Sequence, residues 1–293
     1  MLLNRKILIK LFWCSVLLWI VAAYQRERLP PPSFVMEPLL QEPVQLPVDD
    51  AQTFRARARR HSYEITPLFS YELYGMVVSR HHSDNWFDYH HEQWKDFLNV
   101  ADLCVIYADN LRSNVYEKMR FSSTDYTCHF RWSSPGVGEF FNGKALSNNH
   151  VLTNKPSLIR KIKKVRPGDQ IYMKGHLVNY HEQNCPECLR PSSISRDDEG
   201  QGACEVVFLE DFRILRTARP VWRLVYYLAL GLTCLLLFFL LRIHEAIAWH
   251  VSRLRGVSQA LQEDGALPDD SSNYSQDQSP DDSSFPPDSG QDR

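Results

Sequence analysis

Two long apolar runs, one near each end of the chain, limit what this sequence can fold into. The first covers residues 7–23 and holds a single charged residue, Lys10, whereas the second covers residues 224–241 and holds none. A helix of about twenty apolar residues crosses the ~30 Å hydrocarbon core of a bilayer. Trp222 and Tyr226 lie near the start of the second run, and such rings favour the membrane interface. We therefore predict two transmembrane helices, at residues 7–23 and 221–241, with the lipid bilayer as a partner.

The first run also admits a second interpretation. Val21 and Ala23 satisfy the small-residue rule of a signal-peptide cleavage site, so residues 7–23 fit either a signal anchor or a cleaved signal peptide. The tryptophans and the length of the run favour a resident helix. We adopt the uncleaved anchor as our prediction.

Charge does not decide which side of the membrane the central residues face. Lys and Arg are equally numerous near the outer ends and the inner ends of the two runs, so the positive-inside rule gives no preference. A short basic N-terminus before an apolar run is typical of a signal anchor, and a long domain after it crosses whatever its charge. We expect a multi-pass membrane protein with two spans, both termini in the cytoplasm and the central domain outside it.

Composition divides the rest of the chain. Residues 1–6 form a short tail, and the prolines of residues 24–62 predict an extended linker that lifts a domain off the bilayer. The folded domain is expected at 63–220. Beyond the second span, apolar residues recur at steps of three and four, which predicts an amphipathic helix at 242–262. Residues 263–293 are rich in Asp, Ser, Gln and Pro and predict a disordered acidic tail.

The central domain is predicted to be mainly β. Strand patterns occupy residues 74–80, 102–108, 126–132, 169–180 and 204–215, and helices are expected at 156–164 and around 89–99. A helix, a Gly-Asp turn, a long strand interrupted by Gly175 and a closing strand follow one another as in the second half of an OB barrel. The predicted fold class is therefore α+β, with two transmembrane helices flanking a small, mainly β, OB-like barrel domain.

The pattern RPGDQIYMKGHLV…CEVVFLEDFRIL resembles the small OB-type domains of bacterial envelope proteins and other membrane-tethered proteins, over roughly residues 98–216. The longer string ALSNNHVL…GDQIYMKGHLVNY…SSISRDDEGQGACEVV resembles an uncharacterised group of bacterial membrane-anchored proteins. These resemblances imply an OB-like domain held at a membrane and carry no implication about activity.

The overall charge points to no particular polymer as partner. The formal net charge is −2, and nucleic acid is not expected outside the cytoplasm. The predicted helix carries a basic edge, which suits anionic lipid heads, a glycan polymer or plain solvation. That edge consists of Arg160, Lys161, Lys163, Lys164 and Arg166. We expect the domain to bind another protein or an envelope component.

The cysteines outside the apolar runs fit several roles. Cys185 and Cys188 form a C-x-x-C pair, which occurs in redox dithiols, zinc sites and local disulfides. Their loop-like surroundings lack the strand and helix of a thioredoxin unit, and no second C-x-x-C is present. Outside the cytoplasm, structural disulfides are the plainest interpretation. The candidates are Cys185, Cys188, Cys104 and Cys128, and the sequence assigns no connectivity.

A histidine-rich stretch is the candidate metal site. His81, His82, His90 and His91 lie close in sequence, and clustered histidines bind zinc or copper. The neighbouring Asp84 and Asp88 could join them. Adjacent histidines point apart on a strand and on a helix, however, so few of them can share one ion. We therefore favour a polar surface with aromatic anchors here, and we predict no cofactor.

The sequence Ser-Asn-Asn-His at residues 147–150 suggests either a turn or a catalytic histidine. Asn149 and His150 are expected to close a turn through hydrogen bonds from side chain to backbone. The competing hypothesis pairs His150 with a nucleophile, Cys204 or Ser195. It requires the two side chains to lie within hydrogen-bond reach.

An acidic loop next to glycines is the candidate binding loop. Arg196, Asp197, Asp198 and Glu199 precede Gly200. Acidic oxygens beside glycines can bind a divalent cation, but the spacing does not fit an EF-hand. A plain connection between two hairpin strands explains the same residues, and we favour it.

No complete catalytic constellation is visible in the sequence. We predict a non-enzymatic membrane protein that presents an extracytoplasmic OB-like domain for binding or as a scaffold. Two alternatives stay open. One is a membrane-anchored thiol or histidine hydrolase that uses His150 and Cys204, and the other is a metal-binding module that uses the stretch from His81 to His91.

Overall fold

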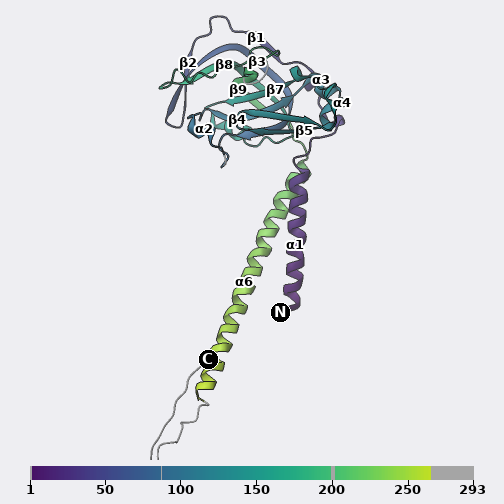
Figure 1. Cartoon of the computed structure of the whole chain (residues 1–293), viewed down its shortest axis with the longest axis vertical. Coiled ribbons are helices and arrows are strands. Elements are labelled where there is room, and N and C mark those ends of the chain that lie inside the picture. Colours follow the sequence, from purple (N-terminus) through teal and green to yellow (C-terminus); the bar gives the residue numbers. More distant parts are fainter. Residues whose placement is uncertain (1, 87, 199–201, 265–293) are drawn as a thin grey trace, which may run out of the picture.

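A computed structural model describes residues 2–86, 88–198 and 202–264 of the chain. Two long helices carry a β-rich head, which we define as residues 26–219 (Figure 1). The predicted acidic tail lies outside the described residues from position 265 onward, and so does Glu199.

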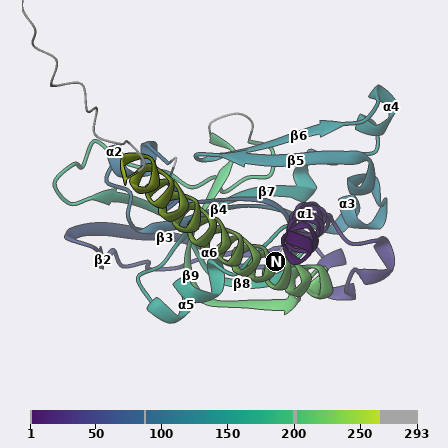
Figure 2. The same cartoon turned by 90° about the horizontal axis from the view of Figure 1, so that it is seen from below.

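The two long helices lie side by side. Helix α1 spans Leu2–Gln25 and leads into the head, and helix α6 spans Pro220–Asp264 and leads away from it (Figures 1 and 2). Small residues line their contact, because Ser15, Ala22 and Ala229 are buried and Thr233 Oγ1 donates to Ser15 Oγ over 3.0 Å. Small residues allow helix backbones to approach closely in a bilayer.

Both helices are long and apolar enough to cross a membrane. Only 11% of the apolar window of each helix is buried, so its side chains face outward. An outward apolar surface of this extent is typical of a membrane or an interaction surface. The structure thus contains two candidate membrane-spanning helices, one of them near the N-terminus.

Helix α6 continues without a break past residue 241. The amphipathic helix predicted at 242–262 is the continuation of the apolar helix and not a separate element. At ~1.5 Å per residue, a helix of 45 residues is about 68 Å long, roughly twice the ~30 Å core of a bilayer.

The strands of the head form one large sheet and a separate hairpin. Strands β1 to β4 span Val44–Pro47, Phe54–Ala58, His61–His82 and Asn99–Ile106. Strands β5 and β6, Met119–Thr124 and Thr127–Trp132, form the hairpin, and strands β7 to β9 span Leu146–Leu152, Gln170–Glu182 and Cys204–Arg216. The short helices are α2 (His90–Gln93), α3 (Ala108–Arg112), α4 (Pro135–Gly138) and α5 (Pro156–Ile162), with single 3₁₀ turns at Pro32–Phe34, Glu37–Leu40, Val115–Lys118 and Gly143–Ala145.

The pairing of the large sheet returns to its starting strand. Its order is β3-β4-β7-β9-β8, with β1 and β2 added on β3, and β8 pairs with β3 again. The β7–β9 pair is parallel and the other pairs are antiparallel. Helix α5 lies between β7 and β8 in the chain and covers the core with Leu158 and Ile162.

Gly175 lies at the point where β8 bends against β9. The register of the two strands shifts between Lys174 and Gly175, and a Cβ atom at Gly175 would lie 2.1 Å from the carbonyl oxygen of Phe208. Only glycine allows this approach, as a glycine within a long strand predicts.

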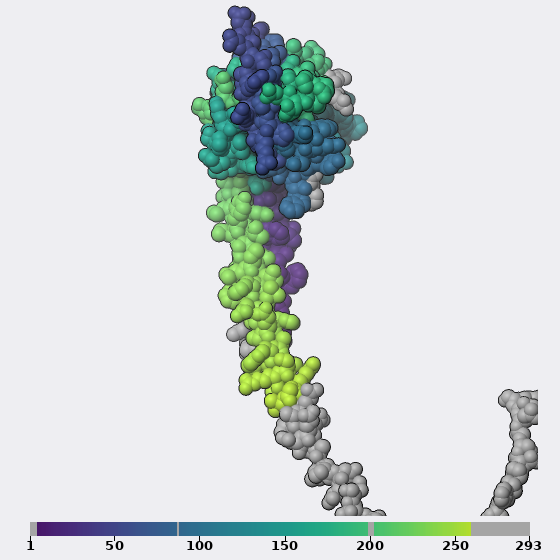
Figure 3. Space-filling view, turned by 90° about the vertical axis from the view of Figure 1, so that its left-hand side faces the viewer, coloured from purple at the N-terminus to yellow at the C-terminus, as the bar shows by residue number. Residues whose placement is uncertain are grey.

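The proline-rich segment is packed on the head, and the prediction of an extended spacer at 24–62 is wrong. Leu39 is fully buried against Met76 and Ile106, and the side chain of Gln170 bonds to the backbone at Phe34 and Met36. Strands β1 and β2 of this segment pair with β3, and Figure 3 shows the dark blue chain running over the surface of the head. The apolar residues between the prolines supply the contacts that composition alone hides.

Two further predictions of local structure are wrong. Residues 147–150 belong to the buried strand β7 and form no turn. Helix α2 ends at Gln93, well before residue 99, because Lys95 adopts a positive φ of 55° and Asp96 and Leu98 turn into the interior.

The Pro-Gly-Asp turn joins the head to the helices. Gly168 has a φ of 84°, and a Cβ atom there would lie 2.8 Å from Ala218 and 2.9 Å from Pro30. The buried carboxylate of Asp169 accepts from Arg223 Nη2 at 2.6 Å and from the amide of Ala218 at 2.8 Å. A positive φ and this crowding both require glycine.

Candidate functional site

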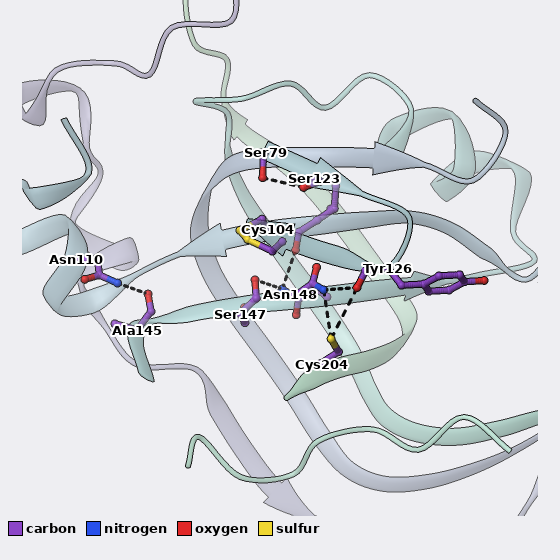
Figure 4. The surroundings of a disulfide bond; sticks show 12 residues. Ser79, Cys104, Asn110, Ser123, Tyr126, Ala145, Ser147, Asn148 and Cys204 are labelled. Atoms are coloured by element: carbon purple, nitrogen blue, oxygen red, sulfur yellow. Dashed lines mark hydrogen bonds between the residues drawn. A yellow bond between two sulfur atoms is a disulfide. The ribbon is translucent and has the colours of Figure 1, made fainter. Parts of the chain in front are cut away.

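The β5–β6 hairpin delivers its tip to the edge of the large sheet. Cys128 on β6 is disulfide-bonded to Cys104 on β4, which fixes the hairpin against the sheet (Figure 4). Asp125 and Tyr126 form the tip, and Tyr126 has a left-handed φ of 59°. Its amide donates to Asp102 Oδ2 over 2.8 Å, which holds this unfavourable conformation.

Two histidines and a further aspartate converge on Asp125 of this tip. We call these four residues the histidine cluster: His81, Asp88, His91 and Asp125. His81 Nε2 lies 2.7 Å from Asp88 Oδ2 and 3.1 Å from Asp125 Oδ1. His91 Nδ1 lies 2.6 Å from the same oxygen of Asp88. The ligand atoms of His81, Asp88 and His91 all lie within 4.8 Å of one another.

The members of the histidine cluster come from separate elements. His81 lies near the end of β3, His91 in the short helix α2, and Asp125 at the hairpin tip. Asp88 lies in the turn before α2 and accepts from the amide of His91 over 3.0 Å. The side chains of Asp88 and His91 are 1% and 2% exposed, so this charged group is almost dry.

A second pair of charged groups adjoins the histidine cluster. Asp102 Oδ1 lies 2.7 Å from His150 Nδ1, and Asn99 Nδ2 lies 2.8 Å from Asp102 Oδ1 and 3.0 Å from His91 Nε2. The ring of Tyr126 stacks on His91 at 4.1 Å and meets His150 edge-on at 5.4 Å. Asn99 and Tyr126 thus join the histidine cluster to the pair of Asp102 and His150.

The pKa values of the carboxylates and of His150 follow from this arrangement. Burial alone would raise the pKa of Asp102, but the charge and hydrogen bond of His150, together with the charge of His91 and the hydrogen bond of Asn99, outweigh burial and lower it. Burial would lower the pKa of His150, but the charge and hydrogen bond of Asp102, followed by the neighbouring Cys204, raise it to about 10. Burial is the largest influence on the pKa of Asp125 and would raise it, but the hydrogen bonds and charge of His90 together with the charge of His81 outweigh burial and lower it.

Cys204 completes a row of three side chains with His150 and Asp102. It lies at the start of β9, opposite Asn148 in the parallel pair, and Asn148 Nδ2 donates to its Sγ over 3.3 Å. Figure 4 shows this amide, the thiol and the carbonyl of Tyr126 linked to one another. Cys204 contributes to the raised pKa of His150, so the two groups are neighbours, but the hydrogen bonds of the thiol are made with Asn148 and with the carbonyl of Tyr126.

The other candidate histidines lie outside the histidine cluster. His90 is half exposed and bonds Asp125 at 2.7 Å from outside. His82 points the other way from His81, and burial followed by the charge of Arg80 lowers the pKa of His82 to about 4. Adjacent residues point apart on a strand, as at His81 and His82, and on a helix, as at His90 and His91. We therefore expected only one histidine of each pair to reach a shared ion.

The remaining candidates have structural partners. The four candidate cysteines form two disulfides, Cys104–Cys128 and Cys185–Cys188. In the candidate loop, Arg196 turns inward to Glu205 and Tyr71, Asp198 accepts from Ser193, and Asp197 pairs with Lys144. The described acidic residues of this loop therefore do not converge on a cation.

Sequence reasoning missed Asp125, Asn99 and Asp102 as members of this site. Asp125 and Tyr126 stand between two strand-like runs, a turn signal that locates a hairpin tip but not the place where it docks. The sequence predicts that Asp102 belongs to a strand at 102–108, but it does not show which face of the sheet its side chain occupies, and that face decides whether Asp102 reaches the site.

Comparison with protein-family models, with curated proteins and with solved structures finds no match for this chain.

Proposed function

We propose that this chain is a membrane-anchored protein whose head is an OB-type domain that binds a transition-metal ion. The observation that carries the proposal is the convergence of His81 Nε2, His91 Nδ1 and the carboxylates of Asp88 and Asp125, with Asp125 19% exposed and the other three side chains at most 9% exposed. Two imidazoles and two carboxylates are donors that suit Zn²⁺, which accepts four nitrogen and oxygen ligands.

The charge of the histidine cluster also supports a dication. Two carboxylates beside two neutral imidazoles carry a charge of −2, which a divalent ion balances. Burying carboxylates without an opposite charge is costly, so a bound dication would stabilise this arrangement. The far nitrogen of His91, Nε2, lies 3.0 Å from Asn99 Nδ2, which also bonds to Asp102, so Asn99 links the imidazole to this carboxylate. Groups behind a ligating imidazole orient it in such centres.

The membrane and fold parts of the proposal rest on separate observations. The two outward-facing apolar helices support anchoring. They run antiparallel, so the first residues of α1 and the last residues of α6 lie away from the head (Figure 1). We propose that the head lies outside the cytoplasm. The strand path that returns to β3, the parallel β7–β9 pair and the helix between β7 and β8 support the OB assignment.

The test is metal content. Full-length protein purified in detergent, stripped with a chelator and dialysed against Zn²⁺, should hold one ion per chain by elemental mass spectrometry. His91→Gln should weaken Zn²⁺ binding by at least about 100-fold. His176→Gln is the matched control, because His176 lies on β8 beside Glu210 and outside the histidine cluster. Equal zinc in both variants, or none in the parent chain, would refute the metal site.

The arrangement of Cys204, His150 and Asp102 favours a second candidate, a thiol nucleophile. In this role Cys204 Sγ would form a thioester with an acyl substrate, the leaving group would take its proton from His150, and water would then release the acid. Asp102 would hold the ring of His150 through Nδ1.

Alkylation kinetics test the thiol candidate apart from metal binding. If Cys204 and His150 act as a nucleophile pair, iodoacetamide should modify Cys204 of the chelator-treated chain at least about tenfold faster than a free cysteine at pH 7. His150→Gln should abolish this advantage. An ordinary rate at Cys204 that His150→Gln leaves unchanged would exclude the thiol chemistry.

A further inference from the structure

A pocket at the junction of the head and the helices carries excess positive charge. It encloses about 380 Å³, within the ~300–1,000 Å³ typical of small-ligand sites. Three arginines line it, together with one carboxylate and several hydroxyl groups, and we call it the arginine pocket. Its charged and hydroxyl-bearing members are Arg26, Arg80, Arg166, Glu27, Ser79, Ser122 and Ser123.

Arg80 is the unusual member of the arginine pocket. It lies near the end of β3, and its Nε atom is buried without a hydrogen-bond partner. Among the described residues, its guanidinium forms no ion pair.

The other charges in the pocket do not compensate Arg80. Glu27 is shared by Arg26 at 3.3 Å and Arg166 at 3.2 Å. Asp169 lies nearby but is fully buried and bound to Arg223. A partly buried guanidinium beside two others, with one carboxylate between them, leaves a net positive site that lacks an anion.

We infer that the arginine pocket binds a phosphate group. Guanidinium groups donate bidentate hydrogen bonds that match phosphate oxygens, and serine hydroxyls add further donors. The hydroxyls of Ser79 and Ser123 lie 2.8 Å apart at the pocket wall, where Figure 4 shows them facing each other.

The position of the pocket indicates where the phosphate comes from. Arg26 follows directly on α1, and its guanidinium lies 3.5 Å from the ring of Tyr226 near the start of α6. A tyrosine and an arginine at the end of an apolar helix mark the level of lipid head groups. The favoured ligand is therefore the phosphate of an anionic phospholipid, a choice of source that rests on the proposed membrane anchoring. Binding of free phosphate does not depend on that anchoring.

The test compares Arg80→Met with Lys164→Met. Lys164 is exposed, lies shortly before the Pro-Gly-Asp turn in the chain and does not line the arginine pocket. Its replacement therefore removes one positive charge, as Arg80→Met does, but leaves the pocket lining intact. Detergent-solubilised full chain receives an equimolar mixture of phosphatidylglycerol and phosphatidylcholine, and native mass spectrometry counts the bound lipids. Calorimetry with inorganic phosphate forms the second arm.

The parent chain should retain phosphatidylglycerol in preference to phosphatidylcholine. Arg80→Met should weaken this binding about 10- to 100-fold, the effect of losing charged hydrogen bonds, whereas Lys164→Met should change it less than about threefold. Arg80-dependent binding of inorganic phosphate without lipid selectivity would support the phosphate site and assign it to a free anion. Binding that Arg80→Met leaves unchanged in both arms would overturn the inference.

Two controls keep a negative result interpretable. Arg80→Met should unfold at the same or a higher temperature than the parent chain in the absence of phosphate, because it removes an uncompensated buried cation. Its zinc content should equal that of the parent chain, so a failure of the phosphate site is distinguishable from a failure of the metal site.

Discussion

The histidine cluster and the arginine pocket bury charge in opposite ways. In the histidine cluster, imidazole nitrogens lie 2.6–3.1 Å from carboxylate oxygens. In the arginine pocket, two of the three guanidinium groups share Glu27, and the third, that of Arg80, has no described ion partner. Both regions use residues near the end of β3, His81 in one and Arg80 in the other, which point to opposite sides of the strand.

The difference indicates how each region would respond to a ligand. The carboxylates and imidazoles of the histidine cluster satisfy one another, so a metal ion must displace protons to enter, and its binding should depend on pH. The arginine pocket has nothing to displace, so an anion should add to a preformed site. Strand β3 therefore contributes His81 to the proposed metal site and Arg80 to the proposed phosphate site.

The largest expected effect on stability comes from removing the carboxylate of Asp102, which pairs with His150 next to the histidine cluster. Asp102→Asn leaves the imidazolium of His150 buried without its carboxylate and should lower the free energy of unfolding by ~3–5 kcal/mol at pH 7. Urea unfolding of the full chain in detergent measures this change.

The pair of Asp102 and His150 should stabilise the fold more at low pH than at high pH. The pKa of His150 is about 10 in the folded chain against 6.5 for the ordinary side chain, so its contribution to stability is fully present below pH 6.5 and is lost as the pH rises towards 10. The deficit of Asp102→Asn should shrink over that window. Asp211→Asn, at an exposed pair with Arg213, should behave like the parent chain; a similar loss there would contradict a specific role for Asp102.

The second prediction concerns the hairpin that both regions share. Asp125 at the β5–β6 tip joins the histidine cluster, and Ser122 and Ser123 on β5 line the arginine pocket. The Cys104–Cys128 disulfide, with a sequence separation of 24, should contribute about 3 kcal/mol by restricting the unfolded chain. Replacing both cysteines by serine should also weaken zinc and phosphate binding together.

The matched control for the hairpin is the other disulfide. Cys185 and Cys188 are three residues apart, so their replacement by serine should cost only about 1.5 kcal/mol and leave both ligands bound. Chemical denaturation and the two binding assays check this. Loss of zinc with retained phosphate binding would show that the hairpin serves the histidine cluster alone.

Local signals in the sequence predicted elements better than the sites that those elements build. The Pro-Gly-Asp turn and Gly175 mark strand β8, because a turn and a close backbone approach each need a particular residue. The strand β7 was missed because Ser-Asn-Asn-His has the composition of a turn. In the strand, the side-chain amide nitrogen of Asn149 donates to Leu103 O on β4 and to the nearby Ser147 Oγ, contacts that the sequence does not reveal.

The histidine cluster could be predicted only in part. His81, Asp88 and His91 lie within a short stretch, so their candidacy was visible, but Asp125 is brought in by a hairpin that docks through a long-range disulfide. Arg80 was not singled out at all. An unpaired cation is defined by the absence of a neighbour in space, and no pattern along the sequence records that.

A third prediction uses a buried arginine that does have a carboxylate. Arg196 pairs with the fully buried Glu205, and burial, opposed by Arg196, raises the pKa of Glu205 to about 7 from 4.5. A raised acid pKa stabilises the fold below pH 4.5, and this contribution is lost as the pH rises through 7. The loss should be on the order of 1–3 kcal/mol. Glu205→Gln should flatten this slope in thermal unfolding, and an unchanged slope would assign the titration to another group.

The smallest expected effect on stability comes from an ion pair at the surface, where solvent weakens the attraction between the two charges. Lys144 and Asp197 form an ion pair with side chains 65% and 74% exposed. Lys144→Ala should change the free energy of unfolding by less than about 0.5 kcal/mol, because solvent screens the pair. Asp197→Asn should likewise leave any effect of Ca²⁺ on the unfolding temperature unchanged. A clear calcium shift that this variant removes would restore the loop as a cation site, and the contrast between two buried regions would then have to include a third site at the surface.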